Sequence, residues 1–220
     1  MSPKDLQKEI SRLTADLISA SLSVDQNFPT LNTEAGVTNI GFGGTEDLSI
    51  TLKNIPYPDA YAVLKEKRAF NIKFPDGAVM QLLYRFEGEE MTKHRLAFFP
   101  SPDLLEYQNE PEIYEEDVLF AEVVDRNVVT VPLRFDFDPR SSVDYDHPAS
   151  HLTIGQYKNC RVPVSGPLTP YTFVNFILRA FYNTPHKSFC GNMTEGPLEM
   201  GSTITDRERR HMHLRLTDKP

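Results

Sequence analysis

The chain has 220 residues, 40% of them hydrophobic and 25% charged, with a formal net charge of −8. This hydrophobic content, which includes 14 Phe and 9 Tyr, can build a packed core and excludes disorder along the whole chain. The acidic balance argues against a nonspecific nucleic-acid binder, because such proteins need clustered Lys and Arg to neutralise phosphates.

Cysteine usage and hydropathy predict a soluble protein of the cytoplasm. Only Cys160 and Cys190 are present, so a disulfide framework is not expected and a reducing compartment is the default. The first residues include Asp5 and Glu9, which do not fit a signal peptide. No apolar run approaches the roughly 18 residues that a membrane span needs.

Charge is distributed unevenly along the chain. Residues 151–220 contain nine Lys and Arg against five Asp and Glu, a net +4, so residues 1–150 carry −12. A solvated surface is the simplest explanation of this pattern. The basic C-terminal part could also bind nucleic acid, and the acidic part, residues 1–150, could contact a protein partner or a second copy in a homo-oligomer.

The N-terminal part of the chain, residues 1–22, is predicted to form an amphipathic helix that covers residues 4–22. Apolar side chains recur there at three- and four-residue spacing between charged ones: Leu6, Ile10, Leu13, Leu17 and Ile18. Residues 23–46 are expected to form a loop. Its glycine cluster at 41–44 is not followed by Gly-Lys-Ser/Thr, so a phosphate-binding loop is not predicted.

An antiparallel sheet is predicted mainly within residues 48–165. Pro75-Asp76-Gly77 is typical of a hairpin turn, and a short helix is expected at 58–67. Residues 103–117 are acidic and are expected to form a loop. Runs of alternating or β-branched residues predict the strands: 48–53, 70–74, 78–87, 91–99, 128–137, 151–154 and 161–165.

The part from 169 to 220 is predicted to contain a helix, a loop and a basic terminal strand. Thr169 can cap a helix over 170–183, with Pro170 at its first position. Residues 184–202 are expected to be loop, and 211–215 alternate like a strand. The whole chain, 1–220, is therefore expected to be one domain of the α+β class.

The densest group of polar residues runs from Arg134 to Arg161. Alternation along a strand places Arg134, Asp136 and Asp138 on one face, and two histidines follow shortly afterwards, His147 and His151. Such carboxylates and imidazoles can hold a divalent metal or form an acid–base pair. The spacing matches no strict metal signature, so a capped turn and an ordinary hydrogen-bonded histidine explain the residues equally well.

Two further groups of basic residues are candidates for substrate binding. His94 and Arg95 are adjacent in a strand and therefore face opposite ways. His94 is then either buried and hydrogen-bonded or part of the site. His211 and His213 share one face of the predicted last strand, which suits a phosphate contact, although a solvated edge strand is the simpler reading.

Five motifs stand in an order that resembles a known family: DGAVMQ at 76–81, KHRLAFFPSP at 93–102, LRFDFDP at 133–139, DHPASHL at 146–152 and CRVPVSGPL at 160–168. Over nearly the full chain the sequence resembles a bacterial family catalogued as domain of unknown function 2290, which implies no particular activity. The stretch between Arg134 and His151 is also similar to small toxins of toxin–antitoxin modules. That likeness implies nucleic-acid processing or defence.

Two functional hypotheses follow, and the sequence does not decide whether the protein is an enzyme. In the first, a divalent metal assists phosphodiester hydrolysis. Asp136, Asp138 and His147 hold this metal, and His151 acts as the base or as a further ligand. The other residues of this hypothesis stabilise phosphate charge (Arg134 and Arg161) or bind substrate (His94, Arg95, His211 and His213). In the second, the same residues form a hydrogen-bonded network in a non-catalytic binding or assembly subunit.

Overall fold

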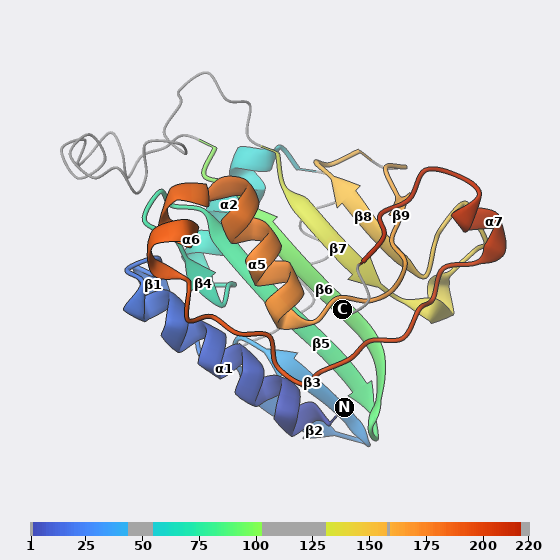
Figure 1. The fold of residues 1–220 in the computed structure, drawn as a ribbon, viewed down its shortest axis with the longest axis horizontal. Helices are drawn as coiled ribbons and strands as arrows, with labels where there is room; N and C mark the ends of the chain where they lie inside the picture. Colours follow the sequence, from blue (N-terminus) through green and yellow to red (C-terminus); the bar gives the residue numbers. More distant parts are fainter. Residues whose placement is uncertain (1, 44–54, 103–130, 158, 217–220) are drawn as a thin grey trace.

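The structure is a computed structural model that describes residues 2–43, 55–102, 131–157 and 159–216 (Figure 1). Helices pack on an antiparallel sheet, which confirms the α+β prediction. The strand predicted at 48–53, the acidic loop at 103–117 and the first residues of the strand at 128–137 lie outside the described residues.

The described strands form one nine-stranded sheet in which every neighbouring pair is antiparallel. The main order is β1-β4-β5-β6-β7-β8-β9, and β2 and β3 form a hairpin whose β3 strand also pairs with β5. The strands are β1 (Asp25–Gln26), β2 (Thr30–Glu34), β3 (Val37–Gly41), β4 (Ile72–Lys73), β5 (Val79–Glu87), β6 (Glu90–Phe99), β7 (Leu133–Phe137), β8 (Ser150–Ile154) and β9 (Val162–Pro163).

The helices begin largely where the sequence predicts them. Ser2 accepts a hydrogen bond from the Asp5 amide at the start of α1, and Thr169 accepts one from the Thr172 amide at the start of α5. Each cap satisfies an amide that has no partner inside its helix. The helices are α1 (Pro3–Ser19), α2 (Tyr57–Glu66), α5 (Pro170–Phe181), α6 (Asn183–Phe189) and α7 (Asp206–Arg209), with a 3₁₀ turn η1 at Pro139–Ser141. Among them, none combines the length and the hydropathy that crossing a membrane requires.

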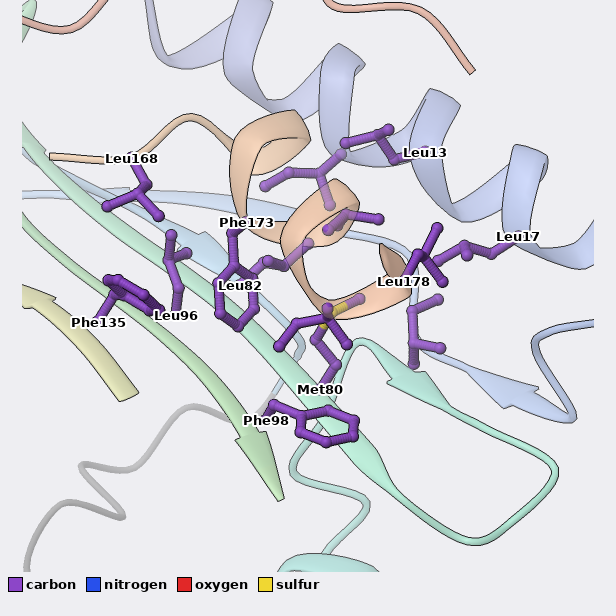
Figure 2. Packing of buried hydrophobic residues seen from close by; sticks show 14 of the residues in the cluster. Leu13, Leu17, Met80, Leu82, Leu96, Phe98, Phe135, Leu168, Phe173 and Leu178 are labelled. Carbon is purple, nitrogen blue, oxygen red and sulfur yellow. The ribbon is translucent and has the colours of Figure 1, made fainter. Parts of the chain in front are cut away.

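The main core lies between one face of the sheet and the helices α1 and α5 (Figure 2). Leu13 and Leu17 of α1 and Phe173 and Leu178 of α5 point at a sheet face that includes Leu82. Each such buried side chain contributes about 1.5–3 kcal/mol to stability. On α5, Phe176 and Ala180 are exposed, while Val174 and Leu178 belong to the buried face.

A smaller apolar cluster lies on the other side of the sheet. Tyr61 and Leu64 of α2 pack there with Val79 of β5 and with Ala97 and Phe99 of β6. Because side chains alternate along a strand, residue 95 of β6 faces the same side as residues 97 and 99. Arg95 therefore lies on this second face, next to the α2 cluster.

Three sequence predictions are wrong for physical reasons. Residues 25–41 form β1, β2 and β3, because a tight turn at Ala35-Gly36 without the usual Asn-Gly signal joins β2 to β3. Helix α6 occupies part of the predicted 184–202 loop. The predicted last strand does not form, since α7 precedes it and Leu214 makes only an isolated bridge to Val164 beyond the short β9 edge.

Candidate functional site

A row of three polar residues crosses the second face of the sheet. In the antiparallel register Arg95 of β6 lies directly opposite Asp136 of β7, which lies directly opposite His151 of β8. Directly opposite residues point to the same face, so their side chains meet. Asp136 is 7% exposed and His151 is 4% exposed. We call Arg95, Asp136 and His151 the polar row.

The carboxylate of Asp136 binds two arginines. Arg95 Nε donates to Oδ1 at 3.0 Å, and Arg134 Nε, from the same face of β7, donates to Oδ2. Burial raises the pKa of Asp136, but the charges of Arg95 and Arg134 and their hydrogen bonds outweigh burial and leave the pKa below its usual value. Asp136 is therefore ionised at neutral pH and fixes both guanidinium groups.

His151 faces this carboxylate as a neutral ring. Its Nδ1 lies 2.9 Å from the carbonyl oxygen of Pro148, and because a carbonyl only accepts, Nδ1 carries the proton. Burial lowers the pKa of His151, which keeps the ring uncharged at neutral pH. Its Nε2 is 3.8 Å from Asp136 Oδ2, beyond hydrogen-bond distance.

The two arginines keep donors that Asp136 does not use. Each guanidinium binds Asp136 through Nε, and within the described part of the chain the terminal nitrogens of Arg95 and Arg134 have no hydrogen-bond partner. Their side chains are 20% and 30% exposed, so a ligand in solvent can reach them. Two oriented guanidinium groups beside one carboxylate can bind an anion.

The structure places two other predicted site residues away from this carboxylate. Asp138 binds Lys93 Nζ at 3.0 Å and, as the N-cap of η1, accepts from Ser141. His94 lies on the opposite face of the sheet, where its Nε2 accepts from the Leu168 amide at 3.1 Å. Of the two expectations for His94, the structure favours the buried, hydrogen-bonded residue.

The remaining predicted residues lie beside the row or in two clefts. The His147 ring is 5.0 Å from the His151 ring, and burial and then the charge of Arg161 lower the pKa of His147. Arg161 and His211 line a cleft of about 760 Å³. His213 lines a different cleft of about 710 Å³, and the predicted strand on which His211 and His213 would share a face does not form at 211–215.

The three predicted metal ligands do not gather around one point. Across residues 2–43, 55–102, 131–157 and 159–216, no group of three or more His, Cys, Asp and Glu side chains could hold a metal ion. Asp136 already binds two guanidinium groups and Asp138 binds Lys93. A metal at Asp136 would have to displace an arginine.

Sequence reasoning missed Tyr145. It has a positive φ of 72°, which is unusual for a bulky residue, and its ring lies 4.7 Å from the His211 ring in the 760 Å³ cleft. No spacing rule could have found this pair, because the C-terminal part of the chain folds back onto the 143–147 turn. The positive φ is also invisible in the residue type.

The comparisons with known proteins give one family. Residues 22–216 match the family described as "Uncharacterized conserved protein (DUF2290)". The chain belongs to this family. No curated protein and no solved structure matches the chain. The part shared with the DUF2290 family contains the polar row, Arg134 and both clefts, while α1 lies before it.

Proposed function

We propose that this member of the DUF2290 family is a non-catalytic protein that binds an anionic ligand through the ligand's phosphate group. The ligand binds at Arg95 and Arg134, which Asp136 holds in place; we call these three residues the phosphate site. The observation that carries the proposal is the pair of guanidinium groups fixed through Nε, with terminal nitrogens that have no partner among the described residues.

The charge and geometry of the phosphate site suit this ligand. Two arginines and one ionised carboxylate leave a net charge of about +1 at the surface of the sheet. Guanidinium groups match the oxygens of phosphate through paired N–H donors. Because Asp136 already holds both side chains, less conformational entropy is lost when the ligand binds.

Two alternatives explain less of the geometry. Metal-assisted hydrolysis needs free carboxylate oxygens, whereas both oxygens of Asp136 accept from arginine. A purely structural ion pair does not account for donors left at the surface of Arg95 and Arg134. His151 has a neutral Nε2 that lies 3.8 Å from Asp136 Oδ2, beyond hydrogen-bond distance, and this carboxylate already binds two arginines.

The proposal predicts that phosphate binding depends on Arg134. We expect Arg134→Gln to weaken binding of inorganic phosphate by about tenfold or more, because charge-assisted hydrogen bonds contribute roughly 1.5–3 kcal/mol. Arg95 still pairs with Asp136 in this variant, so the fold is retained. Binding is measured from amide chemical shifts of labelled protein during a phosphate titration at low ionic strength.

The matched control is Arg12→Gln on α1, where Arg12 pairs with Asp16 at 3.4 Å on the other side of the molecule. It removes the same charge and should leave phosphate affinity unchanged. Equal affinity in Arg134→Gln and the wild type would overturn the proposal. So would divalent-metal binding with nucleic-acid cleavage that Asp136→Asn abolishes, since that result supports the hydrolase hypothesis.

A further inference from the structure

The cleft of about 760 Å³ lies next to the phosphate site. Pro163 of β9 lines the cleft and is directly opposite His151, which is in turn opposite Asp136. Two inter-strand spacings, about 10 Å in all, therefore separate Asp136 from this wall. His147 bridges the two regions, because its ring contacts His151 and its pKa responds to Arg161.

Tyr145 lines this cleft, and hydrogen bonds fix the backbone around it. The backbones of Val143 and His147 exchange two hydrogen bonds of 2.9 and 2.8 Å around it, which closes a tight turn. The Tyr145 amide donates to Oε1 of the buried Glu208 at 3.4 Å. A bulky residue kept at a positive φ marks a position that the surrounding structure fixes.

The ring of Tyr145 has a cation over one face and remains partly exposed. Arg207 lies 4.9 Å from the centre of the ring and the His211 ring lies 4.7 Å away. Tyr145 nevertheless remains 40% exposed, and Met212 on the same cleft is 86% exposed. A flat, polarizable ligand can stack on these side chains.

Polar groups in the cleft can form hydrogen bonds with the edge of such a ligand. Asp146, Asn159 and Arg161 line it, and within the described residues their side chains make no hydrogen bond with another residue. They supply a carboxylate acceptor, an amide that both donates and accepts, and a guanidinium donor. We call these three residues, with Tyr145, His211 and Met212, the stacking cleft.

We propose that the stacking cleft binds the base of a nucleotide unit whose phosphate occupies the phosphate site. This inference rests on the proposed function and names the class of its ligand. The base stacks on the exposed part of the Tyr145 ring, to which the His211 ring is tilted by 54°. Stacking on aromatic side chains is how proteins hold bases without a duplex. Its edge meets the polar groups of Asp146, Asn159 and Arg161, which line the cleft. The size of the cleft is in the range of small-ligand sites.

The test compares ligands that differ only in the base. Adenosine monophosphate should bind the wild type on the order of tenfold more tightly than ribose 5-phosphate, because one stacked base is added. Tyr145→Asn should abolish this difference and leave ribose 5-phosphate affinity unchanged. Asn tolerates a positive φ, so this variant keeps the turn. Tyr145→Phe retains the ring and should retain the preference.

The outcomes separate this inference from the proposed function. If ribose 5-phosphate binds but the adenine base adds no affinity, or Tyr145→Asn keeps the preference, the nucleotide inference is wrong and phosphate binding stands. If neither compound binds, both are wrong. If Arg134→Gln leaves the affinity for adenosine monophosphate unchanged, the phosphate does not occupy the proposed position and the inference fails.

A short oligoadenylate distinguishes the two sources of a nucleotide unit. Tighter binding of the oligoadenylate than of adenosine monophosphate supports a single strand, since further phosphates would then reach the basic residues around Arg207. Equal affinities support a free nucleotide. In both cases the base-dependent part of the affinity requires Tyr145. If Tyr145→Asn leaves that part of the affinity unchanged, the inference is contradicted.

Discussion

At the scale of single residues, Asp136 decides what its neighbours can do. Its ionised carboxylate orients Arg95 and Arg134 and sits near the unprotonated Nε2 of His151. Removing the negative charge would leave two half-buried cations close together. Losing the charged partner of a buried cation lowers the free energy of unfolding, even where the intact ion pair contributes little net stability.

We therefore expect Asp136→Asn to lower the free energy of unfolding by about 2 kcal/mol at neutral pH. Asn keeps the size of the side chain but offers one acceptor to the two guanidinium groups. Urea unfolding of wild type and variant measures the difference. Asp16→Asn, which loses only a partly exposed pair with Arg12, should change stability by less than about 0.5 kcal/mol. Similar losses in both variants would contradict this account of Asp136.

The sequence predicted only part of this residue-scale geometry. Alternation along one strand correctly predicts that Arg134 and Asp136 share a face, because that rule needs no partner strand. It could not pair Asp136 with Arg95, since the register between β6 and β7 depends on the intervening chain and on packing. Local sequence patterns therefore could not predict the contact between the Asp136 carboxylate and the Arg95 guanidinium.

At the scale of elements, the quality of the turn signal explains which strands could be predicted. The turn at Pro75-Asp76-Gly77 carries strong turn residues, and the strands on either side of it, β4 and β5, were predicted. The β2–β3 hairpin turns at Ala35 and Gly36 with φ of 48° and 80°. Alanine gives no hint of a left-handed conformation, so this hairpin was missed.

The same turn yields a prediction for stability. Ala35→Asn should raise the free energy of unfolding by about 0.5–1 kcal/mol, because Asn adopts a positive φ with less strain than Ala. Gly36→Ala should lower it by about 1 kcal/mol. An added Cβ at Gly36 meets nothing within 4 Å, so that loss reports backbone strain alone. Thermal and urea unfolding check both; an unchanged Gly36→Ala would contradict the assigned turn.

At the scale of the whole molecule, β6 connects the two faces of the sheet. Arg95 reaches the phosphate site on one face, and His94 reaches the segment before α5 on the other. Leu168 in that segment donates its amide to His94 and accepts from the Tyr84 hydroxyl at 3.0 Å. These two bonds tie the α1–α5 layer to the centre of the sheet.

Contacts between parts of the chain that are far apart were the least predictable feature. The return of the C-terminal part to Tyr145 and to Val164 depends on α7 and on an isolated bridge. Neither arises from a local repeat of apolar residues. The alternation at 211–215 therefore suggested a strand, while tertiary packing places these residues around two clefts.

The tie through His94 predicts how the whole molecule responds to acid. Burial lowers the pKa of His94 to about 4, against the opposing effect of the Asp136 charge. The unfolded chain, with an ordinary pKa of about 6.5, therefore binds more protons between these values. Stability from His94 is complete above pH of about 6.5 and is lost as the pH falls toward 4.

We expect wild type to lose about 2 kcal/mol more than His94→Gln between pH 7.5 and pH 5, at about 1.4 kcal/mol for each pH unit below the unfolded pKa. Gln can accept from the Leu168 amide without titrating, so the bond persists in acid. Other histidines with lowered pKa values, His147, His151 and His186, contribute equally to both proteins and cancel. Urea unfolding at the two pH values gives the difference. If the stabilities of wild type and His94→Gln change in parallel with pH, protonation of His94 does not break its hydrogen bond with the Leu168 amide, and this account is wrong.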